Sequence, residues 1–120
     1  MQIRKTYSDV NPKLLYDEVR DFVLKQGTII GESKLETYLL ADNTSSFMFR
    51  GNLTFKVQVG QNKAEQECLR AHIVGMTKGE TKLMFDINDE LFSEEKLSSL
   101  QDDLDFIFSS YEAGINDEET

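Results

Sequence analysis

Residues 47–59, FMFRGNLTFKVQV, alternate between two kinds of side chain along their whole length. The odd positions are apolar or glycine, and the even positions are mostly polar. The two sets are Phe47, Phe49, Gly51, Leu53, Phe55, Val57 and Val59, and Met48, Arg50, Asn52, Thr54, Lys56 and Gln58. A period of two is that of a β-strand, whose successive side chains point to opposite faces. The stretch therefore predicts a strand with one buried face and one polar face.

The same alternation occurs in four further stretches of the chain. They span about residues 2–7, 28–41, 68–73 and 81–87. Residues typical of turns separate the last four strands, namely Asp42-Asn43-Thr44-Ser45, Gly60-Gln61-Asn62-Lys63 and Thr77-Lys78-Gly79. Links this short join antiparallel strands, because parallel neighbours need crossovers of a dozen or more residues. The pattern therefore predicts an antiparallel sheet of five strands.

Two other stretches follow the helical period. The first has Asn11 as a favoured N-cap, Pro12 at the first helical position and Gly27 as a stop. The second begins at the N-cap Ser93 and is expected to end at Gly114. Its apolar stripe consists of Leu97, Leu100, Leu104, Ile107, Phe108 and Tyr111. Both stretches predict amphipathic helices, which need a surface to cover.

The composition is that of one acidic domain. The 120 residues include 13 Lys and Arg against 22 Asp and Glu, a net charge of -9. A field of this sign repels polyanions, so neither nucleic acid nor a membrane is an expected partner. The first residues lack an apolar run behind their charges, which predicts a cytoplasmic protein. Residues 1–113 are expected to form a single α+β domain, and residues 114–120 an acidic, disordered tail.

The expected order of elements is strand, helix, four strands, helix. An antiparallel five-stranded sheet with both helices packed on one face buries every apolar stripe, which predicts an α+β fold. This order resembles the helix-grip fold of the START and Bet v 1-like proteins, and equally one repeat of the TATA-binding-protein-like fold. The resemblance implies two alternative surfaces. Bet v 1-like proteins bind apolar ligands between the C-terminal helix and the sheet, whereas the TATA-binding fold uses its open sheet face.

The covered face is the first candidate site. Small residues on the strand at 28–41 stand near bulky residues on the strand at 47–59, and tyrosine hydroxyls lie within reach of the rim. Space of this kind suits an apolar ligand held by a few polar anchors. The candidate pocket residues are Tyr7, Gly31, Ser33, Thr37, Phe49, Phe108 and Tyr111. The alternative is that glycine relieves sheet curvature and that helix side chains fill the space.

The open face is the second candidate site. Its outward charges are Lys34, Arg50, Lys56, Arg70 and Lys82 against Glu32, Glu36 and Asp86. The face thus carries a net charge of +2 and leaves -11 for the rest of the chain. This separation predicts a surface for a protein partner or for a homodimer. The candidate interaction residues are Arg50, Lys56, Arg70, His72, Lys82, Met48 and Met84. The alternative is a solvated face with cross-strand ion pairs.

His72 and Cys68 are the only histidine and the only cysteine, and both are expected on the open face near Arg70. A guanidinium lowers the pKa of a nearby thiol, but a nucleophile also needs a positioned base and an oxyanion site. The chain lacks the phosphate-loop, HExxH, GxSxG, EF-hand and CxxC patterns. No catalytic residue, metal or cofactor is therefore expected. The sequence favours a non-enzymatic binding module, then a carrier of an apolar ligand, and last an enzyme that uses His72 or Cys68.

Overall fold

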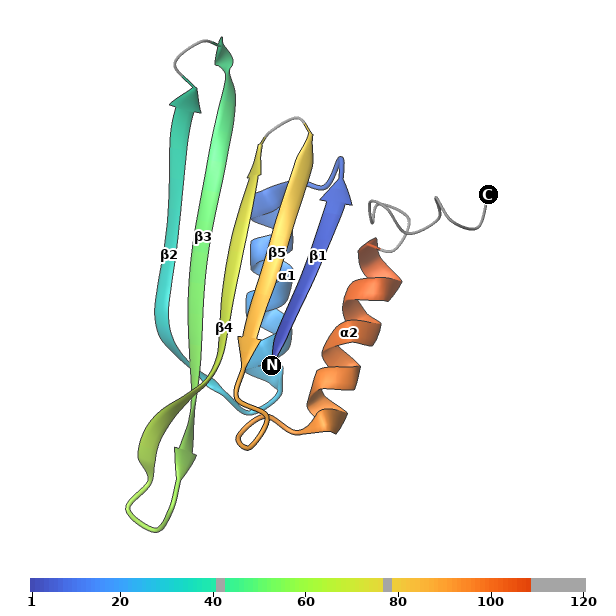
Figure 1. Cartoon of the computed structure of the whole chain (residues 1–120). Helices are drawn as coiled ribbons and strands as arrows, with labels where there is room; N and C mark the ends of the chain where they lie inside the picture. Colours follow the sequence, from blue (N-terminus) through green and yellow to red (C-terminus); the bar gives the residue numbers. More distant parts are fainter. Residues whose placement is uncertain (41–42, 77–78, 109–120) are drawn as a thin grey trace.

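The computed structural model in Figure 1 describes residues 1–40, 43–76 and 79–108, and the side chains of residues 39–40 and 43–47 lie outside that description. The elements are β1 (Gln2–Ser8), α1 (Pro12–Lys25), β2 (Ile29–Leu40), β3 (Asn43–Val59), β4 (Ala64–Met76), β5 (Glu80–Ile87) and α2 (Glu94–Phe108). This order confirms the predicted one.

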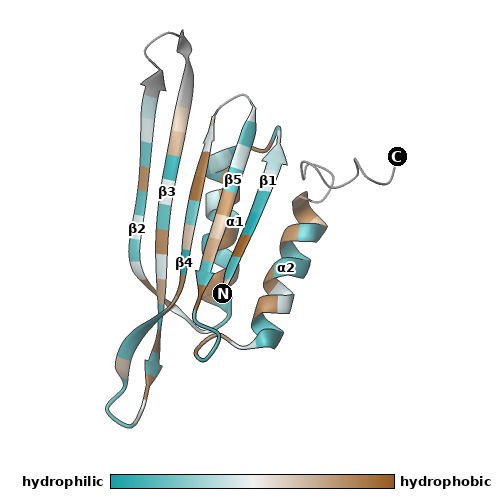
Figure 2. Ribbon diagram, viewed as in Figure 1, coloured by the Kyte–Doolittle hydropathy of each residue, from teal (hydrophilic) through white to brown (hydrophobic). Residues whose placement is uncertain are grey.

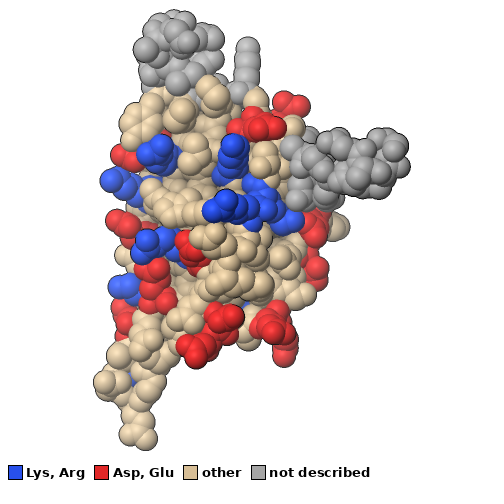
Figure 3. Space-filling model, in the orientation of Figure 1, with Lys and Arg blue, Asp and Glu red and all other residues tan. Residues whose placement is uncertain are grey.

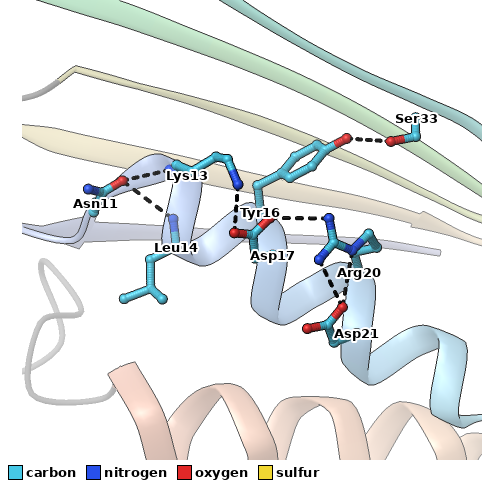
Figure 4. Close-up of polar contacts among 8 residues, drawn as sticks. All are labelled: Asn11, Lys13, Leu14, Tyr16, Asp17, Arg20, Asp21 and Ser33. Carbon is cyan, nitrogen blue, oxygen red and sulfur yellow. Dashed lines mark hydrogen bonds and ion pairs between the residues drawn. The ribbon is translucent and has the colours of Figure 1, made fainter.

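The five strands form one antiparallel sheet in the order β1-β5-β4-β3-β2. β1 is one edge of the sheet, beside β5, and β2 is the other. Both helices lie on the same face, as Figures 1 and 4 show, and no described element covers the opposite face. The architecture confirms the predicted α+β class. It leaves one face of the sheet open.

The core lies between the helices and the covered face. The strands contribute Leu53, Phe55, Leu69, Ala71, Ile73, Leu83, Phe85 and Ile87, and the helices contribute Leu15, Tyr16, Val19, Val23, Leu97, Leu100, Leu104 and Phe108. Figure 2 shows hydrophobic and hydrophilic residues alternating along β5 and around α2. Burial of this apolar surface drives folding, at about 25 cal/mol per Å².

Both helices begin at the predicted caps. The Asn11 side chain accepts hydrogen bonds from the backbone amides of Lys13, at 2.8 Å, and Leu14, at 3.4 Å (Figure 4). These bonds satisfy two of the amides that a helix start leaves without partners. At the other end of α1, Gly27 has a φ of +91°, a left-handed conformation that glycine adopts without strain. In α2, the Ser93 hydroxyl accepts a hydrogen bond from the amide of Lys96 at 3.3 Å.

The strict alternation of β4 breaks at Cys68. β3 advances by one residue, from Phe55 to Lys56, while β4 advances by two, from Leu69 to Glu67. Cys68 is therefore the additional residue of a β-bulge. Cys68 and Leu69 are both buried, each only 1% exposed. The prediction that Cys68 lies on the open face is wrong, because the bulge turns its side chain into the core.

One predicted turn is also wrong. β3 begins at Asn43, which pairs with Leu40, so most of the turn expected at 42–45 is strand. Pairing with β2 outweighs the turn preference of these polar residues. The next predicted turn is confirmed by a hydrogen bond of 3.2 Å from the Lys63 amide to the Gly60 carbonyl. Predictions that lie outside the described residues concern Thr77-Lys78, the helix end at Gly114 and the tail at 114–120.

Candidate functional site

The open face is organised in rows that cross all five strands, because paired residues of an antiparallel sheet point to the same side. The Lys82 row contains Glu36, Arg50, Val74, Lys82 and Thr6. The His72 row contains Lys34, Asn52, His72, Met84 and Arg4. The Asp86 row contains Glu32, Thr54, Arg70, Asp86 and Gln2. The three rows lie side by side across the sheet.

Positive charge gathers in two of these rows. The Lys82 and His72 rows together hold four cations and one carboxylate, a net charge of +3, whereas the Asp86 row has a net charge of -1. Figure 3 shows most Lys and Arg side chains of this face in a band across the sheet, with Asp and Glu predominating toward the lower end. On a protein of charge -9, this band is a local site for anionic groups.

The single carboxylate of the two cationic rows, Glu36, already has partners. Its hydrogen bond with Tyr38 raises the pKa of that phenol. One of its oxygens also lies 3.9 Å from the Lys34 ammonium nitrogen. Glu36 and Lys34 thus offset each other at the β2 edge. The net positive charge is left toward the β1 side of the band.

On that side, the open face has a hollow of about 550 Å³, named here the open-face hollow. Its lining residues are Arg4, Lys5, Thr6, His72, Val74, Lys82, Leu83 and Met84. Val74 and Met84 are half-buried, whereas Arg4 and Lys82 are exposed. Among the described residues, neither Arg4 nor Lys82 forms an ion pair. The hollow therefore combines apolar surface with two cations that can form ion pairs with the carboxylates of another molecule.

Arg4 was missed by sequence reasoning. The alternation of residues 2–7 places it on the side opposite Ile3 and Tyr7. What the sequence did not show is the neighbour of this strand, and the structure pairs Arg4 with Met84 of β5. That pairing brings a further cation to the open face.

A second, smaller hollow of about 240 Å³ lies next to the first, and His72 lines both. Its other lining residues are Glu32, Lys34, Asn52, Thr54 and Arg70. The Arg70 guanidinium donates a hydrogen bond of 3.1 Å to Glu67, which raises the pKa of Arg70. The cations of this hollow are thus already matched by carboxylates. It is the less favourable site for an acidic ligand.

The structure brings only some of the predicted interaction residues together. His72, Lys82 and Met84 line the open-face hollow. Arg50 lies in the Lys82 row, two strands away from Lys82. Two others lie at opposite ends of the face. Met48 pairs with Tyr38 and Met76, whereas Lys56 pairs with Ile29 and Glu67.

The predicted pocket on the covered face is divided between the two edges of the sheet. The rings of Tyr7 and Phe108 have centroids 5.6 Å apart at the β1 edge. Ser33 and Thr37 lie on β2, with Phe49 opposite Thr37 on β3. β1 and β2 are four strand spacings apart, about 19 Å. Tyr111 lies outside the described residues. The two described groups therefore do not line one cavity.

The prediction for Gly31 is wrong as to its face. Gly31 is an additional residue between paired positions of β2, and a Cβ on it would lie 2.8 Å from Thr54 Oγ1 and Lys56 Cε. Both of these residues belong to the open side, so Gly31 opens no space under the helices. Helix side chains do fill the covered face, since Tyr16 lies against Gly51 (Figure 4 shows the Tyr16 ring).

Ser33 has a structural partner. Its hydroxyl is 2.7 Å from that of Tyr16, and this hydrogen bond joins α1 to β2 (Figure 4). Ser33 was predicted as a small residue that leaves space for a ligand, and the bond instead ties it to Tyr16 of α1.

Burial changes the chemistry of Cys68. Removal from water raises the pKa of its thiol, so the neutral form is favoured. A neutral, buried thiol is a poor nucleophile. Cys68 also lines neither of the hollows that His72 lines. The structure thus separates the two side chains proposed for catalysis.

No helix in the described ranges combines the length and apolar character needed to span a membrane. The resemblance to helix-grip and TATA-binding-protein-like folds rests on element order and stays a prediction. Comparisons with protein-family models, with curated proteins and with solved structures find no match to this chain.

Proposed function

We propose that the protein is a non-enzymatic binding module whose open sheet face takes an acidic segment of a partner protein. The open-face hollow is the observation that carries the proposal. An apolar side chain of the partner fits against Val74 and Met84, and carboxylates beside it fit against Arg4 and Lys82. Apolar surface beside fixed charge is suited to specific protein contacts, because burial supplies affinity and charge selects the partner.

Charge disfavours two other occupants. The overall charge of -9 repels a phosphate backbone, and the open face offers few aromatic rings for base stacking. A second open face, packed symmetrically on the first, would set cationic rows against cationic rows. A short acidic protein segment carries fewer charges than a phosphate backbone, so the overall charge repels it less, and it meets the cationic rows directly.

Fluorescence anisotropy with a labelled peptide, in which Asp residues flank one Phe, tests the proposal. An exposed ion pair contributes about 0.2–1 kcal/mol, and charge reversal replaces attraction by repulsion of similar size. The double variant Arg4→Glu/Lys82→Glu should therefore lose about 1–4 kcal/mol of binding free energy. That loss corresponds to a roughly fivefold to several-hundred-fold weaker Kd.

The matched control is Lys25→Glu/Lys63→Glu, which makes the same change in net charge at exposed positions outside the hollow. It should bind the peptide nearly as the wild type does. A second control replaces Asp by Asn in the peptide, which should weaken binding to the wild type. Equal affinity of both double variants would show that the peptide binds elsewhere and would remove the basis of the proposal.

A further inference from the structure

The outer side of α2 carries an acidic stripe with one aromatic residue. The stripe consists of Glu95, Ser98, Ser99, Asp102, Asp105 and Phe106, all exposed and spaced three or four residues apart along one side of the helix. Phe106 is 90% exposed, the largest value among the exposed large hydrophobic residues whose side chains the structure describes. A phenyl ring this exposed leaves its apolar surface in contact with water. A partner that covers the ring would gain the free energy of burying that surface.

We infer that this α2 stripe of one molecule docks on the open sheet face of a second copy of the chain. The inference rests on the proposed function and names its partner. Phe106 enters the open-face hollow against Val74 and Met84 of the other copy. Asp102, one turn before Phe106 on the helix surface, then faces Arg4 and Lys82, while Asp105 keeps its ion pair of 3.4 Å with Lys5 of its own chain.

Charge and size support this arrangement. α2 carries five carboxylates and one lysine, opposite two sheet rows with a net charge of +3. A helix of 15 residues is about 22 Å long at 1.5 Å per residue. Five strands are about 19 Å across. The helix as a whole is therefore long enough to cross the open face, and the stripe from Glu95 to Phe106, about 17 Å long, covers most of that width.

Charge also decides the symmetry of the contact. Two open faces are both cationic, and two α2 stripes are both acidic, so contacts between like surfaces are repulsive. Only helix against sheet pairs opposite charges. Such a contact is heterologous, because the helix of one copy meets the sheet of the next, and only the two end copies keep a free surface, one a sheet face and the other an α2 stripe. The wild type should thus form assemblies that grow with concentration and shrink as salt is added.

Sedimentation velocity on the full chain, from micromolar to millimolar concentration, tests the inference with two variants. The sheet variant is Arg4→Glu/Lys82→Glu and the helix variant is Phe106→Ser. All three positions are exposed, so both variants should fold, which circular dichroism checks. Each variant alone should stay monomeric. An equimolar mixture should form a species of twice the monomer mass and nothing larger, because only one productive interface remains.

The Lys25→Glu/Lys63→Glu control should assemble as the wild type does. A wild type that stays monomeric over the whole range, or a helix variant that still assembles alone, would overturn the inference. If the wild type is monomeric but binds the Asp–Phe peptide, the inference fails and the proposed function stands. If it neither assembles nor binds the peptide, both fail.

Discussion

Replacement of Gly51 by alanine tests how closely α1 packs on the sheet. Gly51 lies in the middle of β3, beneath the ring of Tyr16. A Cβ at this position would lie 2.6 Å from Tyr16 Cδ2 and 3.0 Å from Cε2. The ring has little freedom to move away, because Tyr16 is 3% exposed and its hydroxyl bonds to Ser33 at 2.7 Å. The added methyl group therefore overpacks the core.

Two opposing terms set the size of the effect. Overpacking costs about 1–3 kcal/mol, and so tight a contact with a fixed ring favours the upper half of that range. Alanine is favoured over glycine inside a strand by about 0.5–1 kcal/mol. Gly51→Ala should therefore lower the free energy of unfolding by about 1–2.5 kcal/mol.

A double-mutant cycle in urea isolates the steric contribution. Tyr16→Val removes both ring atoms that Gly51→Ala would meet. In that background the alanine should raise the free energy of unfolding by about 0.5–1 kcal/mol. The coupling between the two sites should thus equal the steric cost, about 2–3 kcal/mol. If Gly51→Ala has the same effect in both backgrounds, Tyr16 does not fill the space above Gly51 and the packing argument is refuted.

Two further residues give independent predictions. Asn11→Ala should lower the free energy of unfolding by about 1 kcal/mol, because two backbone amides of α1 lose their acceptor. Thermal denaturation measures this loss, and an unchanged stability would show that the cap is unimportant. Cys68 should react with iodoacetamide only after unfolding, since it is 1% exposed, and rapid labelling of the native protein would contradict the bulge. Burial raises the pKa of the Cys68 thiol above its ordinary value of 9.0, so the unfolded chain loses this proton first. The contribution to stability is full below that value and falls as the pH rises above it, and the comparison with Cys68→Ala in alkaline urea titrations measures the difference.

Much of the fold was predictable because its signals are local. The alternation of residues 47–59 and the short links specify antiparallel neighbours, and Asn11 and Ser93 mark the helix starts. The bulges at Gly31 and Cys68 were not predictable in this way, since one additional residue reverses the faces on one side of it.

The candidate site was predictable only in part. Alternation placed His72, Lys82 and Met84 on the open face, where the structure has them. Arg4 joins them because β1 and β5, the first and last strands in the sequence, pair with each other. No local sequence pattern specifies that pairing. The predicted pocket failed to assemble for the same reason, because Tyr7 and Ser33 share a face but lie on opposite edge strands.

The central claim is that the open-face hollow binds an acidic segment with an apolar anchor. The most direct test follows the backbone amide shifts of nitrogen-15-labelled protein during titration with the Asp–Phe peptide, at a protein concentration where it is monomeric. The largest changes are expected on β1, β4 and β5 around Arg4, His72 and Lys82. A separate hollow of about 570 Å³ is lined by residues that include Gly27, Ile29, Val57, Leu91 and Lys96. Changes confined to α1 or to this separate hollow, with none on the open face, would contradict the claim.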